Sequence, residues 1–127
     1  MSARTRRRRP GATAAWVSVV IALALAPAWA HTFVVRSEPP SGSILAVPLS
    51  RVRIWFDGPV ERSFLTIRVE DRDRQRVDRD DARVDAHDQT LIEVGIPLLP
   101  PGRYRVAWSV IARDGHRRDG DFFFRVK

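Results

Sequence analysis

Residues 103–111 read Arg-Tyr-Arg-Val-Ala-Trp-Ser-Val-Ile, and every second position from Tyr104 to Val110 carries a large apolar side chain. An apolar residue at every second position is typical of a β-strand with one buried face. Shorter segments with the same period occur at 52–56, 65–69, 92–96 and 122–126. Between residues 31 and 127 no segment shows a convincing helical period, so the sequence predicts an all-β protein.

The expected number of strands narrows the choice of fold class. A possible strand at 32–37 and a weak one within 76–84 bring the expected total to about seven in a hundred residues. Turn sequences rich in Pro, Gly and Asp separate the strands, for example at 38–42, 57–59 and 99–102. This pattern predicts a small β-sandwich of the immunoglobulin-like type, with a closed β-barrel as the alternative.

The positive charge of the chain is concentrated at its start. The 127 residues carry 22 Lys and Arg against 15 Asp and Glu, a net charge of +7. Five of the arginines and no acidic residue lie within residues 1–30, so the remainder is nearly neutral. A strongly cationic surface for binding DNA or RNA is therefore not expected.

Residues 1–30 have the three parts of a secretory signal peptide. Arginines lie between Arg4 and Arg9, an apolar stretch follows from Ala14 to about Pro27, and Ala28-Trp29-Ala30 forms a cleavage site. The apolar stretch is shorter than the ~20 residues that a membrane-spanning helix needs. We therefore expect export by the general secretory route, although a twin-arginine route stays open, and a processed domain of residues 31–127 without a membrane span.

Cleavage after Ala30 would make His31 the first residue, with an α-amine beside its imidazole. The chain has no Cys, and its one Met, Met1, would leave with the signal peptide, so no sulfur ligand would remain. Asp114 and His116 are separated by one residue, which in an extended backbone turns both side chains the same way. His87 lies in a polar turn and is expected to be exposed and without a ligand.

If folding brings His31 beside Asp114 and His116, one amine, two imidazoles and one carboxylate become available to a metal. Nitrogen and oxygen donors in a plane suit Cu(II), whereas Zn(II) would use the same atoms tetrahedrally. Cu(I) would be held less well, because it prefers sulfur. The candidate metal ligands are therefore His31, Asp114 and His116.

Several segments in this order resemble the CopC family of periplasmic copper-binding proteins. They are His31 after the cleavage site, Ser37-Glu-Pro-Pro-Ser-Gly42, Val52-Arg-Ile-Trp-Phe56 with Pro59-Val60-Glu61, Pro97 to Trp108, and Asp114-Gly115-His116 followed by Gly120 and Phe122-Phe-Phe124. Each segment is weakly specific alone, but their order and spacing together are fairly specific. The resemblance covers essentially all of residues 31–127.

The resemblance implies a Greek-key β-sandwich that binds one Cu(II) per chain near one end. His31 would bind through its amine and Nδ1, Asp114 through its carboxylate and His116 through its imidazole. It also implies a periplasmic carrier in copper resistance or uptake, with an inner-membrane partner of the CopD type. The Met-rich Cu(I) site of some members does not carry over, because the processed chain has no Met.

Two further features bear on this site. Some members have an acidic residue after the Phe of the second strand; here Asp57 follows Phe56, and we leave it outside the predicted ligand set because it could equally cap the turn. Arg113, Arg117 and Arg118 would surround the metal loop with positive charge, which would weaken cation binding or attract an acidic partner.

Two other functions fit parts of the sequence. A copper monooxygenase also uses an amino-terminal His with a second His, but Asp114 would occupy a position that oxygen chemistry needs open. A metal-free immunoglobulin-like interaction module remains if the processed chain does not begin at His31. We expect a copper carrier rather than an enzyme.

Overall fold

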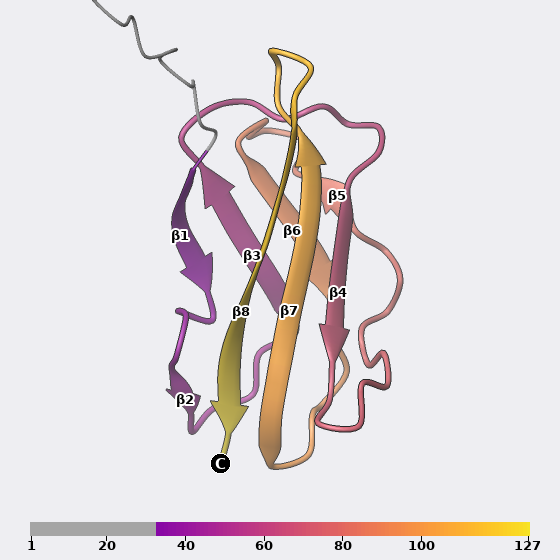
Figure 1. Ribbon diagram of the computed structural model, residues 1–127. Coiled ribbons are helices and arrows are strands. Elements are labelled where there is room, and N and C mark those ends of the chain that lie inside the picture. The colour runs from indigo at the N-terminus through magenta and orange to yellow at the C-terminus, as the bar shows by residue number, and fades with distance from the viewer. Residues whose placement is uncertain (1–32) are drawn as a thin grey trace, which may run out of the picture.

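The fold is that of a computed structural model, which describes residues 33–127. This part of the chain contains eight strands and no helix (Figure 1). Accordingly, nothing in residues 33–127 forms a helix that could cross a bilayer. The strands are β1 (Val34–Glu38), β2 (Ile44–Leu45), β3 (Arg51–Phe56), β4 (Thr66–Glu70), β5 (Arg83–Val84), β6 (Leu91–Gly95), β7 (Gly102–Ile111) and β8 (Arg117–Val126).

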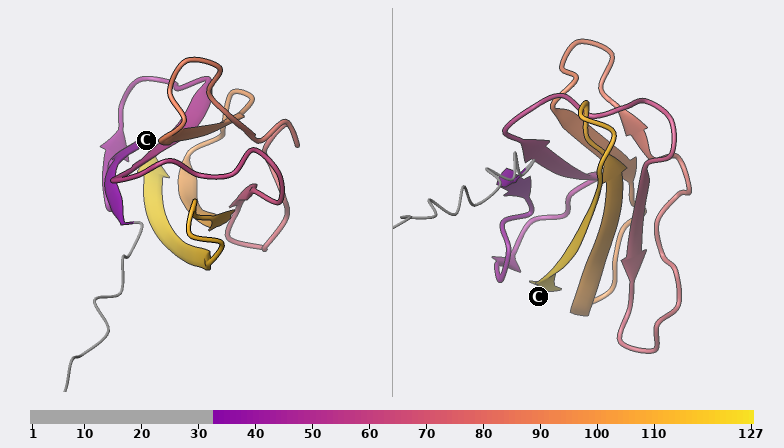
Figure 2. Two further views of the ribbon diagram at one scale, coloured as in Figure 1. Left: turned by 90° about the horizontal axis from the view of Figure 1, so that it is seen from above. Right: turned by 45° about the horizontal axis from the view of Figure 1, so that its top comes forward.

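The strands form two four-stranded sheets that pack face to face as a Greek-key β-sandwich (Figures 1 and 2). One sheet has the order β1-β3-β6-β5 and the other has the order β2-β8-β7-β4. Every pairing between these strands is antiparallel except that of β2 with β8. The all-β sandwich predicted from the sequence is therefore confirmed, and the closed barrel is excluded.

The apolar residues that alternate along the sequence form the core of the sandwich. The inward residues of β3, Val52, Ile54 and Phe56, are at most 3% exposed. On β7, Tyr104, Val106 and Val110 are buried in the same way, and Trp108 is half-buried against the core. Burial of the inward side chains of β3, β4, β6, β7 and β8 supplies the main stabilisation of a domain that has no disulfide.

A buried carboxylate lies on the outer face of the first sheet. Glu93 on β6 is 4% exposed, and its Oε1 accepts hydrogen bonds from Arg51 and Arg83. Arg53 approaches the other oxygen at 3.5 Å. The three arginine side chains are each about half exposed, so they cover β6 while keeping contact with water.

The structure differs from the expected strands in two places. The last strand begins at Arg117 rather than at residue 122, because its backbone pairs with β7 as far as Ile111↔Arg117. The two-residue strand β2 was not expected; it forms by pairing with the end of β8. Both additions depend on backbone pairing, across a hairpin for the start of β8 and between distant segments for β2, and carry no apolar alternation of their own.

Several charged side chains of the segment between β4 and β6 form hydrogen bonds or ion pairs with groups in or next to that segment. Asp71 accepts backbone hydrogen bonds from Asp73 and Gln75, and Asp78 accepts one from Val69. Arg76 forms ion pairs with Asp78 and with Asp80. The segment is therefore a loop with one short strand, β5, which falls within the weak strand expected at 76–84.

Candidate metal centre

Asp114 and His116 lie in the tight turn that joins β7 to β8. The backbone N–H of Gly115 donates to the carbonyl of Ala112 at 2.9 Å, and the N–H of Ala112 donates to the carbonyl of His116 at 2.9 Å. Gly115 has φ = 84°, a left-handed conformation that other residues adopt only with strain. The turn therefore requires glycine between the two candidate ligands.

The side chains of Asp114 and His116 contact each other, as the sequence predicted. Asp114 Oδ1 accepts the backbone N–H of His116 at 2.9 Å, and Oδ2 lies 3.1 Å from His116 Nδ1. The contact arises from a turn that the aspartate itself caps, not from the extended backbone assumed in the prediction. The carboxylate and Nδ1 thus face each other, and the imidazole is 71% exposed.

The same contacts keep the carboxylate charged. The backbone N–H of His116 is the largest cause that lowers the pKa of Asp114 below its ordinary value, and the His116 side chain lowers it further. Partial burial opposes the shift, and the charges of His116 and Arg118 add to it. Asp114 is therefore an ionised oxygen donor beside an exposed imidazole at neutral pH, a combination that suits a divalent cation.

His31 lies outside the described residues, but Phe33, two residues later, forms two hydrogen bonds with Asp57. The N–H of Phe33 donates to Asp57 Oδ1 at 2.9 Å, and the N–H of Asp57 donates to the carbonyl of Phe33 at 2.9 Å. Asp57 directly follows β3, with which β1 pairs. These two reciprocal hydrogen bonds fix the position of the second residue after His31.

The segment after β3 also joins this point to the β7–β8 turn. Val60 forms a β-bridge with Ala112, and the N–H of Glu61 donates to the carbonyl of Ile111 at 2.8 Å. Phe33, residues 57–61 and residues 112–116 therefore gather at one end of the sandwich, which we call the turn end (Figure 1). The start of the described chain and the Asp114–His116 pair lie at this same end.

Within residues 33–127, no group of three His, Cys, Asp or Glu residues is placed to hold a metal ion. Asp114 and His116 supply two donors, so a complete site needs at least one more donor from elsewhere. His87 is exposed, as expected, and its N–H donates to Asp85 in a separate turn. The structure thus brings together two of the three predicted ligands and leaves the third, His31, undescribed.

Of the three arginines expected around the site, one lies close to the carboxylate. Arg118 Nη2 is 3.9 Å from Asp114 Oδ2. Arg117 instead donates to Ser109 Oγ at 2.9 Å, and Arg113 donates to Gln89 at 3.4 Å. The positive charge next to the metal ligands is therefore smaller than the sequence suggested.

Aromatic side chains support the turn end from inside. The rings of Phe56 and Trp108 meet edge to face, with their centroids 5.1 Å apart. Trp108 lies across Gly120, its cross-strand partner; a Cβ added there would be 2.7 Å from the indole ring. The absence of a side chain at Gly120 therefore leaves space for the indole of Trp108 to lie across β8.

Sequence reasoning left Asp57 outside the site, and the structure gives it a role in anchoring Phe33. The sequence signal for it was the acidic residue directly after an alternating strand. That signal became specific only when the pairing of β1 with β3 was known, because the pairing places Phe33 opposite Asp57.

Comparisons with known proteins agree with this architecture. The CopC domain family model matches residues 34–127. Copper transport protein CutJ of Bacillus subtilis (strain 168) is 30% identical over 114 residues, which cover 87% of this chain and 21% of CutJ. The chain thus spans about a fifth of the length of CutJ. Protein YobA of Escherichia coli (strain K12) is 26% identical over 100 residues, which cover 78% of this chain and 81% of YobA.

Two solved structures have the same fold. CopC from Methylosinus trichosporium OB3b matches with a TM-score of 0.71 and 28% identity, over 76% of this chain and 94% of that one. PcoC, described as a methionine-rich copper resistance protein from Escherichia coli, matches with a TM-score of 0.64 over 77% of this chain and 100% of PcoC. Its identity is 24%, so the likeness to PcoC concerns the fold alone. Because the family model matches nearly all of the described residues, the chain belongs to the CopC domain family.

Proposed function

We propose that this chain is a periplasmic copper carrier that holds one Cu(II) at the turn end through His31, Asp114 and His116. As a CopC family protein of copper resistance or transport, it is a binding protein rather than an enzyme. In this proposal residues 1–30 are a signal peptide, and its removal frees the amine of His31. The amine and imidazole of His31 would then close a chelate ring on the metal.

The observation that carries the proposal is the Asp114–His116 pair. Its carboxylate is ionised, its imidazole is exposed, and Asp114 Oδ2 and His116 Nδ1 face each other at a distance of 3.1 Å. Two donor atoms at this separation can occupy neighbouring positions around one metal ion. The anchoring of Phe33 by Asp57 at the same end supports His31 as the source of the remaining donors.

The donor set favours Cu(II) over Cu(I). Amine, imidazole and carboxylate groups are the nitrogen and oxygen ligands that Cu(II) accepts in a planar arrangement. The processed chain would have no sulfur ligand, since its sequence has no Cys and no Met after Met1. As the acceptor of the released copper we propose an inner-membrane transporter of the CopD type.

The test is a Cu(II) competition titration of the exported protein, with its first residue identified by mass spectrometry. We expect one Cu(II) per chain and an electron paramagnetic resonance spectrum of mixed nitrogen and oxygen ligation. His31→Ala and His116→Ala should each weaken binding strongly. His87→Ala is the matched control, because His87 is exposed in a different turn.

A second variant separates the amine from the imidazole of His31. One Gly inserted before His31 keeps the imidazole and moves the amine one residue away, so it should weaken binding nearly as much as His31→Ala. Affinity should also fall as the pH drops through the imidazole range near ~6.5, since bound ligands must lose their protons. Equal affinity of the inserted variant and the wild type would refute the chelate.

A further inference from the structure

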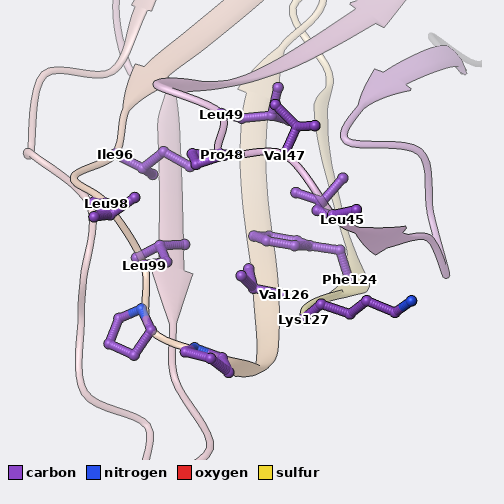
Figure 3. A pocket seen from close by; sticks show the side chains of 13 residues that line it. Leu45, Val47, Pro48, Leu49, Ile96, Leu98, Leu99, Phe124, Val126 and Lys127 are labelled. Carbon is purple, nitrogen blue, oxygen red and sulfur yellow. The ribbon is translucent and has the colours of Figure 1, made fainter.

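At the end of the sandwich opposite the β7–β8 turn, the two sheets do not close completely. Here a cavity of about 320 Å³ lies between residues 45–49 and 96–101, with Phe124 and Val126 of β8 also lining it (Figure 3). Nearly all of its lining side chains are aliphatic or aromatic. We call this region, made up of residues 44–49, 96–103 and 125–127, the carboxyl end.

Three aliphatic side chains at the carboxyl end project into solvent instead of filling the core. Ile44 is 60% exposed, Val47 is 72% exposed and Leu98 is 76% exposed. Val47 and Leu98 belong to the two segments that line the cavity. Single exposed apolar residues are ordinary, but three of them around an apolar cavity form a patch that is typical of an interaction surface.

The same end carries basic side chains that have no acidic partner. Within residues 33–127, Arg103, Arg125 and Lys127 are exposed and form no ion pair. Of the fourteen other arginines in residues 33–127, eight form ion pairs, as Arg105 does with Asp121 and Arg83 with Glu93. The carboxyl end is therefore more positive than the nearly neutral composition of residues 31–127 suggests.

Two of these basic residues lie directly opposite each other. Arg103 on β7 and Arg125 on β8 are cross-strand partners, and like charges in this position destabilise a sheet. The Arg103 guanidinium lies 4.0 Å from the centre of the Phe123 ring, which positions it without neutralising it. An anionic partner at this end of the sheet would reduce the repulsion between the two arginines.

We propose that the carboxyl end docks onto an anionic lipid surface. Exposed aliphatic side chains flanked by basic ones are the combination that binds the interface of an anionic bilayer. A second copy of the chain is disfavoured, because two such ends would bring their positive charges together. A bilayer suits this end better than an acidic protein, because the exposed aliphatic side chains, Ile44 and Val47 on one segment and Leu98 on another, can enter it without a matching set of pockets.

This docking would leave the candidate metal centre facing away from the lipid. Phe33 and the Asp114–His116 turn lie at the turn end, whereas β2 and the end of β8 lie at the opposite end (Figure 1). Variants at the carboxyl end should therefore leave Cu(II) affinity unchanged. Failure of the lipid proposal and failure of the copper proposal would be told apart by the same set of variants.

The test is co-sedimentation of the exported protein with vesicles of phosphatidylcholine alone or with one-quarter phosphatidylglycerol. We expect binding to the anionic vesicles at low salt and its loss at high salt. Each basic residue near such a surface contributes about fivefold to partitioning, so Arg125→Ser with Lys127→Ser should lower binding about 25-fold. Val47→Asp with Leu98→Asp should abolish it.

The matched controls carry the same changes at the turn end. Arg62→Ser with Arg113→Ser removes two exposed positive charges there, and Phe64→Asp replaces an aromatic side chain that is 86% exposed. Both should bind vesicles within twofold of the wild type. Equal losses in the two charge variants, no sedimentation with anionic vesicles, or binding to polyglutamate but not to vesicles would each overturn the proposal.

Discussion

Replacement of Asp57 by Ala tests how the start of the domain contributes to metal binding. The change removes the carboxylate that accepts the N–H of Phe33 at 2.9 Å, two residues after His31. The second bond of the pair, from the N–H of Asp57 to the carbonyl of Phe33, involves only backbone and stays possible. The variant therefore loosens the anchor of the segment without deleting any predicted ligand.

The size of the effect follows from one exposed hydrogen bond, which contributes about 1 kcal/mol. If metal binding requires Phe33 to return to its anchored position, binding must supply this free energy, and Cu(II) affinity should fall about fivefold. Global stability should change little, because β1 keeps its pairing with β3 from Val34 to Glu38. A chelator competition titration measures the affinity, stopped-flow release measures the dissociation rate, and urea unfolding measures the stability.

Asp57→Asn is the informative control, because its side-chain oxygen can still accept the N–H of Phe33. We expect it to retain affinity within twofold of the wild type. Equal weakening in the Asn and Ala variants would show that the negative charge of Asp57 matters and not its hydrogen bond. Unchanged affinity in the Ala variant would show that anchoring Phe33 contributes nothing to binding.

Two other predictions concern the scaffold, and a third concerns the charge of Asp114. Gly120→Ala should lower the free energy of unfolding by about 1–3 kcal/mol, because its Cβ would be 2.7 Å from the Trp108 ring; thermal unfolding measures this, and Gly58→Ala, with no atom within 4 Å, should be neutral. Glu93→Gln should cost about 1–3 kcal/mol in urea unfolding, less than a fully buried pair would, because its arginines are about half exposed; its Cu(II) affinity should not change. The lowered pKa of Asp114 means that its contribution to stability is present above about pH 4 and is lost as the pH falls through the lower folded value. The stability of the wild type relative to Asp114→Asn should therefore fall between pH 5 and pH 2; a constant difference would contradict the shift.

The alternating strands could be predicted from sequence because their inner side chains are individually apolar. Val52, Ile54 and Phe56 are all buried, and the same period located β7. The first half of β8 was missed because its inward positions are Arg118 and Gly120, which give no apolar signal. There the strand is held by its backbone pairing with β7 and by the close approach of Trp108 to Gly120.

The candidate site was predictable only where its residues are close in sequence. Asp114 and His116 could be paired from their spacing, and the structure confirms their contact. The role of Asp57 in holding Phe33 depends on a pairing between segments 24 residues apart, which one sequence does not reveal. The participation of His31 stays a prediction.

The β7–β8 turn and Phe33 belong to the two different layers of the sandwich. Asp114 and His116 lie on the β7–β8 connection of one sheet, whereas Phe33, two residues after His31, precedes β1 of the other. An ion bound by groups from both layers would add a cross-link between sheets that no disulfide joins. The free energy of unfolding should then rise with the concentration of free Cu(II). The increase should be about 2.7 kcal/mol when that concentration is a hundred times the dissociation constant. Under the proposed function, the protein would therefore be most stable while it holds its ion.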